Sequence, residues 1–164
     1  MKDVRFRVRA RRGDDLESLL ELDLASARHH ATIDPAWYRV PERDEVAAFL
    51  ERRLADDARH VLVAEVDGKV VGAVDVIIVG PRDPGSIARP IRTADIGISV
   101  ADNWRGRGIG RALMAAAEDD ARARGAEQIV LDMSAANEGA LRFYHALGYR
   151  EYGLLLRRSL RREP

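Results

Sequence analysis

Apolar and polar residues alternate with two different periods along this chain, and the difference separates the expected strands from the expected helices. In residues 4–9, apolar residues alternate with arginines, and this period of two predicts a half-buried strand. Asp14 and Glu17 have the spacing of a capping box, and leucines at helical spacing follow them. The pattern therefore predicts a first helix that runs to about Ala31.

A second helix and a hairpin are expected next. Proline suits a first helical position, so the helix is expected to begin at Pro41. Its predicted buried face consists of Val46, Phe49, Leu50 and Leu54. Residues 60–66 and 69–79 are rich in valine and isoleucine, and the Asp67-Gly68 dipeptide between them suits a type I′ turn. These two segments therefore predict an antiparallel hairpin.

The second half of the chain predicts alternating strands and helices. Residues 80–92 are expected to form a loop that is a candidate flap at a substrate site, followed by a strand over 94–100. A helix is then expected to begin at 106–110 and end at Gly125, before a strand over 128–133. The last expected elements are a helix capped by Asn137 and ended by Gly148, and one or two strands over 149–160. This order predicts an α+β fold in which a mixed sheet carries helices on its faces.

Size, charge and composition narrow the possible functions. A chain of 164 residues has the size of a single domain. The 27 basic and 27 acidic residues balance, so no net charge attracts the protein to nucleic acid or to an anionic membrane. The chain lacks cysteine, and the adjacent His29 and His30 point to different sides of a helix, so no metal site is expected. No apolar run approaches the ~20 residues of a membrane span, and a soluble cytoplasmic protein is expected.

The turn Arg105-Gly106-Arg107-Gly108-Ile109-Gly110 is the strongest candidate for a ligand site. A pyrophosphate needs a dense set of hydrogen-bond donors, and the backbone N–H groups at the start of a helix supply one. Glycines let the backbone come close to the ligand, and Arg105, Arg107 and Arg111 can add ion pairs. The structural alternative is a mobile connection between a strand and a helix.

Two other phosphate-binding loops do not fit this turn. A Walker loop requires Gly-Lys-Ser/Thr, which the chain lacks. A dinucleotide fingerprint requires a further glycine where Arg111 stands, although Asp132 has the spacing of the ribose-binding acid. The missing glycine argues against a dinucleotide site.

These residues resemble the GNAT family of N-acetyltransferases, whose signature is Gln/Arg-x-x-Gly-x-Gly/Ala at the start of its central helix. Residues 105–110 match this signature, with Ile98-Ser99-Val100 as the preceding strand and Trp104 before the arginine. The second motif of the family is similar to residues 137–144 followed by Leu147-Gly148-Tyr149. The resemblance covers roughly residues 95–152, and the first half of the chain agrees with it in the order of elements.

The resemblance implies both the fold and the co-substrate. It implies an acyl-CoA N-acyltransferase fold, with a sheet of six to seven strands and about four helices, and acetyl-CoA bound by residues 105–111. In this family the two central strands diverge, and the pantetheine arm lies between them on backbone groups that Ile98 and Val100 would supply here. Asn137 would contact the arm as well as cap its helix. A homodimer is expected, with the final strands abbreviated or completed by a neighbouring subunit.

Acyl transfer to an amine needs an acid for the departing thiolate and a base for the amine. Tyr144 has the family position of the acid, and with an ordinary pKa of ~10 its hydroxyl is protonated at neutral pH. Alternatively Tyr144 is a core aromatic residue, because it shares an apolar stripe with Ala140 and Leu147. Asp95 matches the usual acidic position for the base, with Asp75 as the alternative, and either could instead be a solvated carboxylate at a strand end.

Asp34, Trp37 and Tyr38 lie where the acceptor site of the family is bordered by the loop between its first helices. They could shape an amine pocket or pack as a hydrophobic anchor. The leading hypothesis is an acetyl-CoA-dependent N-acetyltransferase that acts on a primary amine of a small molecule by direct attack. A protein N-terminal or lysine acetyltransferase is the first alternative. A non-catalytic acyl-CoA-binding regulatory module is the second.

Overall fold

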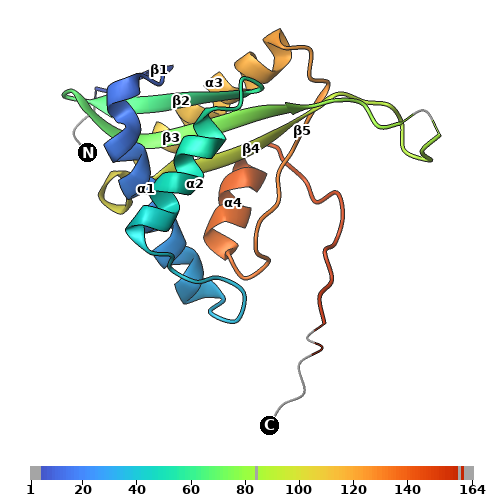
Figure 1. Cartoon of the computed structure of the whole chain (residues 1–164). Helices are drawn as coiled ribbons and strands as arrows, with labels where there is room; N and C mark the ends of the chain where they lie inside the picture. The colour runs from blue at the N-terminus through green and yellow to red at the C-terminus, as the bar shows by residue number, and fades with distance from the viewer. Residues whose placement is uncertain (1–4, 84, 159, 161–164) are drawn as a thin grey trace.

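The computed structural model describes residues 5–83, 85–158 and 160, and a twisted sheet runs through its centre (Figure 1). Five strands lie side by side in chain order: β1 (Arg7–Ala10), β2 (Arg59–Val66), β3 (Lys69–Val79), β4 (Thr93–Val100) and β5 (Gln128–Val130). The first four strands pair antiparallel, whereas β4 and β5 pair parallel. The mixed sheet confirms the predicted fold class.

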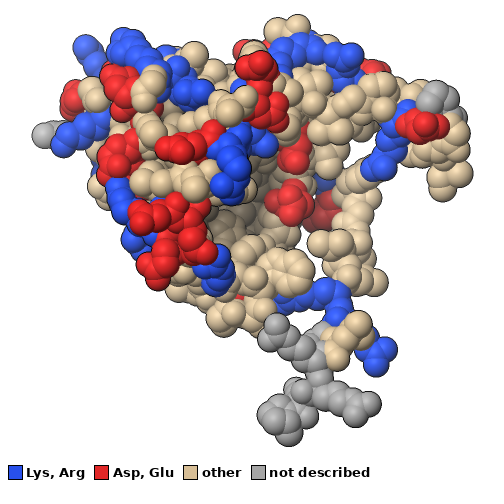
Figure 2. Space-filling view, in the orientation of Figure 1, with Lys and Arg blue, Asp and Glu red and all other residues tan. Residues whose placement is uncertain are grey.

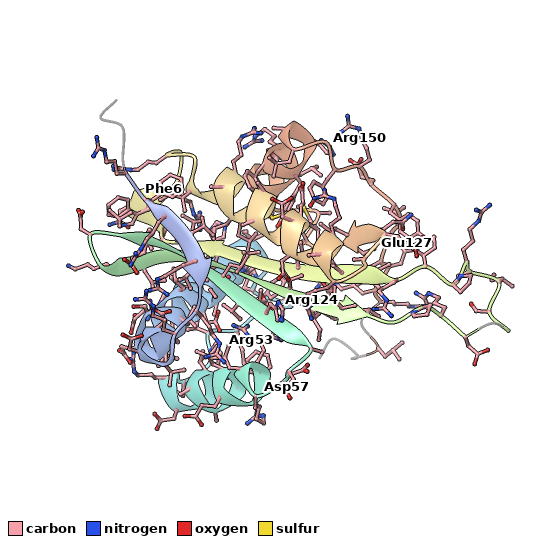
Figure 3. The ribbon with its side chains drawn as sticks, turned by 90° about the horizontal axis from the view of Figure 1, so that it is seen from above. Phe6, Arg53, Asp57, Arg124, Glu127 and Arg150 are labelled. Carbon is pink, nitrogen blue, oxygen red and sulfur yellow. The ribbon has the colours of Figure 1, made fainter. Side chains whose placement is uncertain are left out.

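Helices cover both faces of this sheet. Helices α1 (Leu16–Ile33) and α2 (Arg43–Leu54) lie on one face, and α3 (Ile109–Ala123) and α4 (Glu138–Ala146) lie on the other. Viewed from above in Figure 3, the sheet separates these two helical layers. In the part of the chain that the structure describes, four α-helices agree with the expected number, and two single turns of 3₁₀ helix, Gly13–Asp15 and Asp102–Trp104, precede α1 and α3.

The two layers form two separate apolar clusters. Because successive residues of a strand face opposite sides of a sheet, β2 and β3 contribute to both clusters. The α1 and α2 side buries Leu19, Leu20, Leu24, Val46, Leu50, Val61 and Val63. The α3 and α4 side buries a larger set: Ala64, Val66, Val71, Val74, Val76, Ala94, Ile96, Ile109, Leu113, Met114, Ala117 and Ala121.

The N-terminal elements begin later than the sequence pattern predicted. Val4 lies outside the described residues, and β1 starts at Arg7. The capping box lies two residues earlier than predicted, at Arg12 and Asp15 in place of Asp14 and Glu17, because the carboxylate of Asp15 accepts the Arg12 N–H at 2.6 Å. Asp15 is buried and also accepts two hydrogen bonds from Arg9. The paired and buried carboxylate of Asp15 thus fixes where the first helix starts.

The second helix differs from expectation at its start and on one face. It begins at Arg43 rather than Pro41, and a carboxylate oxygen of Glu45 accepts the N–H of the N-cap residue Glu42 at 2.8 Å. Phe49, predicted to be buried, is 53% exposed. The Arg53 guanidinium lies 5.7 Å from the centre of the Phe49 ring, so the ring contacts a cation rather than the core.

The predicted hairpin turn is confirmed. Asp67 and Gly68 have φ angles of 47° and 79° between β2 and β3. A type I′ turn requires positive φ at both central residues, which glycine and aspartate tolerate.

The expected final strands are wrong, so the described residues form five strands where six to seven were predicted. None of residues 150–158 and 160 belongs to a strand. The segment is anchored away from the sheet at both ends, because the Tyr149 hydroxyl donates to Glu118 of α3 and Arg157 pairs with Asp34 after α1. Strand β5 is also shorter than predicted, since its pairing with β4 ends at Asp95 and Val130.

Candidate active site

The glycine-rich turn joins β4 to α3 through two left-handed residues. Gly106 and Gly108 have φ angles of 71° and 82°, and Gly108 is the N-cap of α3. Residues other than glycine rarely adopt this backbone conformation, although nothing lies within 4 Å of a Cβ added at either position. The first N–H groups of a helix have no partner within it. The turn therefore presents donors at the positive end of the α3 dipole.

The edge of β4 beside this turn is open. Pairing with β5 ends at Asp95, as the two strands diverge. The Ala101 N–H donates to the Val71 carbonyl at 3.0 Å, and backbone groups of successive residues point to opposite sides of a strand. The backbone groups of Ile98 and Val100 therefore point away from β3, toward the gap. The divergence that the resemblance implied is present in this structure.

Three exposed arginines surround the turn. The Arg105 Nε donates to the Val100 carbonyl at 3.2 Å, and its guanidinium pairs with Asp102 at 3.0 Å. The guanidinium of Arg107 lies 5.1 Å from the centre of the Trp104 ring. Arg111 reaches the carbonyl of Ala146 at the end of α4 at 3.5 Å. These contacts are weak and solvent-exposed, so the cations can turn toward a bound anion at little cost.

Helix α4 places Tyr144 on the side of the sheet that α3 covers. Its first turn is capped as predicted, because the Asn137 side chain accepts the Ala140 N–H at 3.1 Å. The Tyr144 ring is half-buried, 5.3 Å from the Phe143 ring and 5.8 Å from the Tyr149 ring. Burial, and then the carboxylate of Asp132, raise the pKa of Tyr144 above its ordinary value. Its hydroxyl therefore holds its proton throughout the neutral range.

The two candidate bases differ in their surroundings. Asp95 is exposed at the last position of β4 that pairs with β5. Asp75 lies opposite Gly97, where one of its oxygens would be 2.5 Å from an added Cβ atom, and it forms an ion pair with Arg59. Asp75 is thus held by a cation and needs a glycine beside it, whereas Asp95 faces solvent.

The predicted acceptor residues follow α1 directly. The Asp34 carbonyl accepts the N–H groups of Trp37 at 3.1 Å and Tyr38 at 2.9 Å, which folds the loop on itself. Trp37 is 60% exposed, so the alternative of a buried hydrophobic anchor does not hold for it. Burial, and then the charge of Arg105, lower the pKa of His29. Helix α1 also contacts β4, because the Ser99 hydroxyl donates to the Leu22 carbonyl at 3.4 Å.

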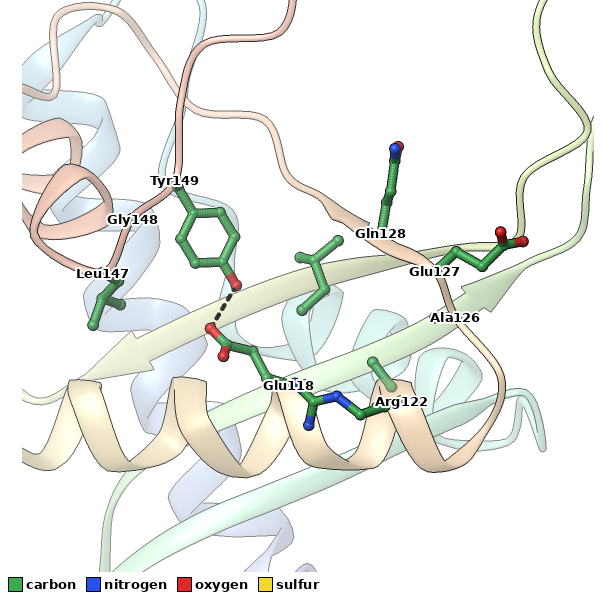
Figure 4. A pocket seen from close by; sticks show the side chains of 10 residues that line it. Glu118, Arg122, Ala126, Glu127, Gln128, Leu147, Gly148 and Tyr149 are labelled. Atoms are coloured by element: carbon green, nitrogen blue, oxygen red, sulfur yellow. Dashed lines mark hydrogen bonds between the residues drawn. The ribbon is translucent and has the colours of Figure 1, made fainter.

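Two cavities lie away from that turn. One of about 530 Å³ opens between α1 and α2 and is lined by His30, Tyr38 and Phe49, among others. The other, of about 300 Å³, lies beside β5, where the Tyr149 hydroxyl donates to Glu118 at 3.0 Å (Figure 4). Within the described residues, no three side chains of the metal-ligating types are grouped to hold an ion. Over the same residues, no helix is both long and apolar enough to cross a membrane.

Comparison with known proteins identifies the family. The model of the acetyltransferase (GNAT) family matches residues 17–149. This chain belongs to the GNAT family. A mouse relative named "Probable N-acetyltransferase family 8 member 5" is 32% identical over 120 residues, which are 69% of this chain and 51% of the mouse protein. This GNAT chain spans about half the length of the curated rodent relatives that it matches.

Solved structures of other proteins share this fold. A Bacillus halodurans protein superposes with a TM-score of 0.85 at 22% identity, over 94% of this chain and 99% of the other. An aminoglycoside N-acetyltransferase in complex with CoA superposes with a TM-score of 0.69 at 23% identity, over 96% of each chain. At sequence identities this low, these superpositions show that the proteins share a fold with this GNAT chain, and no more.

Sequence reasoning missed two features of the site. Arg59 pairs with Asp75 across two strands, and the signal that could have found it is strand register, which places Arg59 opposite Ile77 and Asp75 opposite Val61. Arg157 reaches Asp34 from the far end of the chain, and no local pattern indicates that contact.

Proposed function

We propose that residues 1–164 form one acetyltransferase domain that moves an acetyl group from acetyl-CoA to a primary amine of a small molecule. The observation that carries the proposal is the paired left-handed glycines at the start of α3, beside the open edge of β4. One ligand with a diphosphate and an extended amide-containing arm fits both features. Membership of the GNAT family supports this choice.

In this proposal the turn and the open strand edge bind the co-substrate. The backbone N–H groups of residues 106–110 bind the pyrophosphate, and Arg105, Arg107 and Arg111 balance its charge. Backbone groups of Ile98 and Val100 bind the arm as an added strand would, with Asn137 on its other side. Because Arg105 now donates to the Val100 carbonyl, it must release that carbonyl when the arm binds.

The chemical step needs only two proton transfers besides the bond changes. The neutral amine attacks the thioester carbonyl carbon, a C–N bond forms and the C–S bond breaks. The departing sulfur takes the proton of the Tyr144 hydroxyl, and a carboxylate removes the proton that the amine nitrogen loses. We assign that base to Asp95, because Asp75 is already paired with Arg59.

Small-molecule acceptors are favoured by the character of the acceptor side. Exposed Trp37 and the carboxylate of Asp34 offer an aromatic face and a negative charge, which suit a cationic amine. An aminoglycoside N-acetyltransferase is among the proteins that share this fold. A protein acetyltransferase remains the alternative that the same test distinguishes.

We also propose that the chain functions as a homodimer. Five large apolar side chains of the C-terminal segment are 86–91% exposed: Tyr152, Leu154, Leu155, Leu156 and Leu160. Covering each such side chain stabilises by about 1.5–3 kcal/mol, which a second copy can supply. Light scattering after gel filtration should give a dimer for the wild type and a monomer when Leu154, Leu155 and Leu156 are changed to serine. A monomeric wild type would overturn the dimer.

Thiol release from acetyl-CoA across a panel of acceptors tests the function. The panel contains simple amines, polyamines, aminoglycosides, amino acids and peptides. We expect turnover with a small-molecule amine and none with peptides. Turnover confined to peptides would favour the protein acetyltransferase, and coenzyme A binding without any turnover would favour the regulatory module.

A further inference from the structure

One arginine of the C-terminal segment is held by the loop that follows α1. Arg157 forms an ion pair with Asp34, which lies 123 residues earlier in the sequence. Its guanidinium carbon lies 4.9 Å from the centre of the Trp37 ring. In Figure 1 the segment leaves α4 and descends toward the loop between α1 and α2. The guanidinium thus contacts both a carboxylate and an aromatic face.

The receiving residues are fixed by their own backbone contacts. The Asp34 N–H donates to the His30 carbonyl at 3.0 Å, and the Asp34 carbonyl accepts the Trp37 N–H at 3.1 Å. Trp37 and the Arg157 side chain both remain largely exposed. A carboxylate beside an exposed indole face binds guanidinium or ammonium groups of any source. We call Asp34 and Trp37 together the cation seat.

The cation seat lies on the acceptor side of the proposed reaction. Helix α1, which ends just before Asp34, contacts the strand that leads to the glycine-rich turn, because the Ser99 hydroxyl donates to the Leu22 carbonyl at 3.4 Å. The segment that carries Arg157 starts at Tyr149, whose ring is 5.8 Å from the Tyr144 ring. Residues 149–157 span at most about 28 Å. Figure 2 shows a hollow with acidic side chains beside this segment.

We propose that the cation seat binds a second cationic group of the acceptor, a guanidinium or an ammonium, and that Arg157 occupies it when no acceptor is bound. This inference rests on the proposed function, because it names the class of amine that the same site accepts: one with two cationic groups. The reacting amine then lies toward the carboxylates of the sheet, while the second cation replaces Arg157.

Replacement of Arg157 is expected to be easy. An exposed ion pair and an exposed cation–π contact are each weak. A binding site that an internal group occupies for about 80–90% of the time binds its ligand about 5- to 10-fold more weakly than the vacant site. Removing Arg157 should therefore strengthen acceptor binding, whereas an ordinary structural ion pair would not have this effect.

The test measures binding of agmatine, which carries a guanidinium and a primary amine, to the full chain without coenzyme. The chain has two tryptophans, so the indole N–H signal of Trp37 can be followed by NMR and assigned by its loss in Trp37→Phe. We expect the agmatine dissociation constant to fall about 5- to 10-fold in Arg157→Ala. In Asp34→Asn the saturable shift should disappear.

Two controls make the result specific. Arg158→Ala removes the same charge from the neighbouring position and should bind agmatine as the wild type does. n-Butylamine, which lacks the second cation, should shift the Trp37 signal only at much higher concentration than agmatine does. Equal agmatine affinity in wild type and Arg157→Ala, or undiminished binding in Asp34→Asn, would overturn the cation seat. Coenzyme A calorimetry on the same proteins reports separately on the proposed function, since the seat is measured without coenzyme.

Discussion

Phe143 of α4 packs directly against Gly110 of α3. A Cβ atom added to Gly110 would lie 3.2 Å from Cζ and 3.4 Å from Cε2 of the Phe143 ring, so the contact leaves little room for a side chain. Gly110 is the third glycine of the turn, yet its φ is not in the left-handed region. Because Tyr144 follows Phe143, this contact sets where the proposed acid lies relative to the turn.

Replacing Gly110 with leucine should displace α4. We expect a loss of about 1–3 kcal/mol in the free energy of unfolding, because the added atoms overpack the contact with Phe143. Turnover should fall as well, since Tyr144 moves with the helix. Urea denaturation of Gly110→Leu, Phe143→Ala and the double variant measures the coupling. Strictly additive losses would show that the two residues do not contact each other in solution.

Asp95 and Asp75 should respond differently to conversion to asparagine. In Asp95→Asn we expect kcat to fall about 10²-fold, because the proposed base is lost. In Asp75→Asn we expect the larger effect on stability, because Arg59 loses its partner. Steady-state kinetics and thermal unfolding of both variants check this assignment. The opposite pattern would transfer the role of base to Asp75.

Tyr144→Phe should separate chemistry from binding. The variant lacks the hydroxyl that protonates the sulfur, so kcat should drop about 10²-fold. The dissociation constant for coenzyme A should change little, because the ring and its packing remain. The matched control is Tyr152→Phe, which alters an exposed ring. A Tyr144→Phe enzyme as active as wild type would exclude the acid role and leave Tyr144 as a core aromatic residue.

Stability above pH 10 should depend on Tyr149. Burial, and then the hydrogen bond with Glu118, raise its pKa above the ordinary ~10. The folded state therefore holds this proton more tightly than the unfolded state, and the stabilisation is complete below about pH 10 and lost as the pH rises further. Urea unfolding of wild type should weaken more steeply between about pH 10 and 11 than that of Tyr149→Phe. The stability of Tyr152→Phe should fall with pH as that of the wild type does. If the stability of Tyr149→Phe falls in the same way, the hydrogen bond between Tyr149 and Glu118 does not form in solution.

The fold could be predicted from the sequence wherever local patterns decide the structure. Alternating valines and Asp67-Gly68 define the β2–β3 hairpin, and the glycines at 106 and 108 mark the turn because left-handed backbone requires them. The Asn137 cap follows from the spacing of a polar residue before an apolar stripe.

The remaining features depend on partners that periodicity does not specify. Phe49 repeats at a buried spacing, but an arginine rather than the core covers it. The leucines after Tyr149 have a strand-like composition, but a strand needs an edge to pair with, and Arg157 binds Asp34 instead. Such contacts join residues far apart in the sequence, so only the folded structure reveals them.

The affinity of the purified chain for coenzyme A, measured by calorimetry, tests the central claim most directly. We expect saturable binding that weakens in Gly108→Ala, because alanine at a φ of 82° costs about 1–2 kcal/mol and disturbs the N–H donors of the turn. Gly13→Ala, at a position with open space and no positive φ, should bind like wild type. No measurable binding, or equal affinity in wild type and Gly108→Ala, would contradict the account.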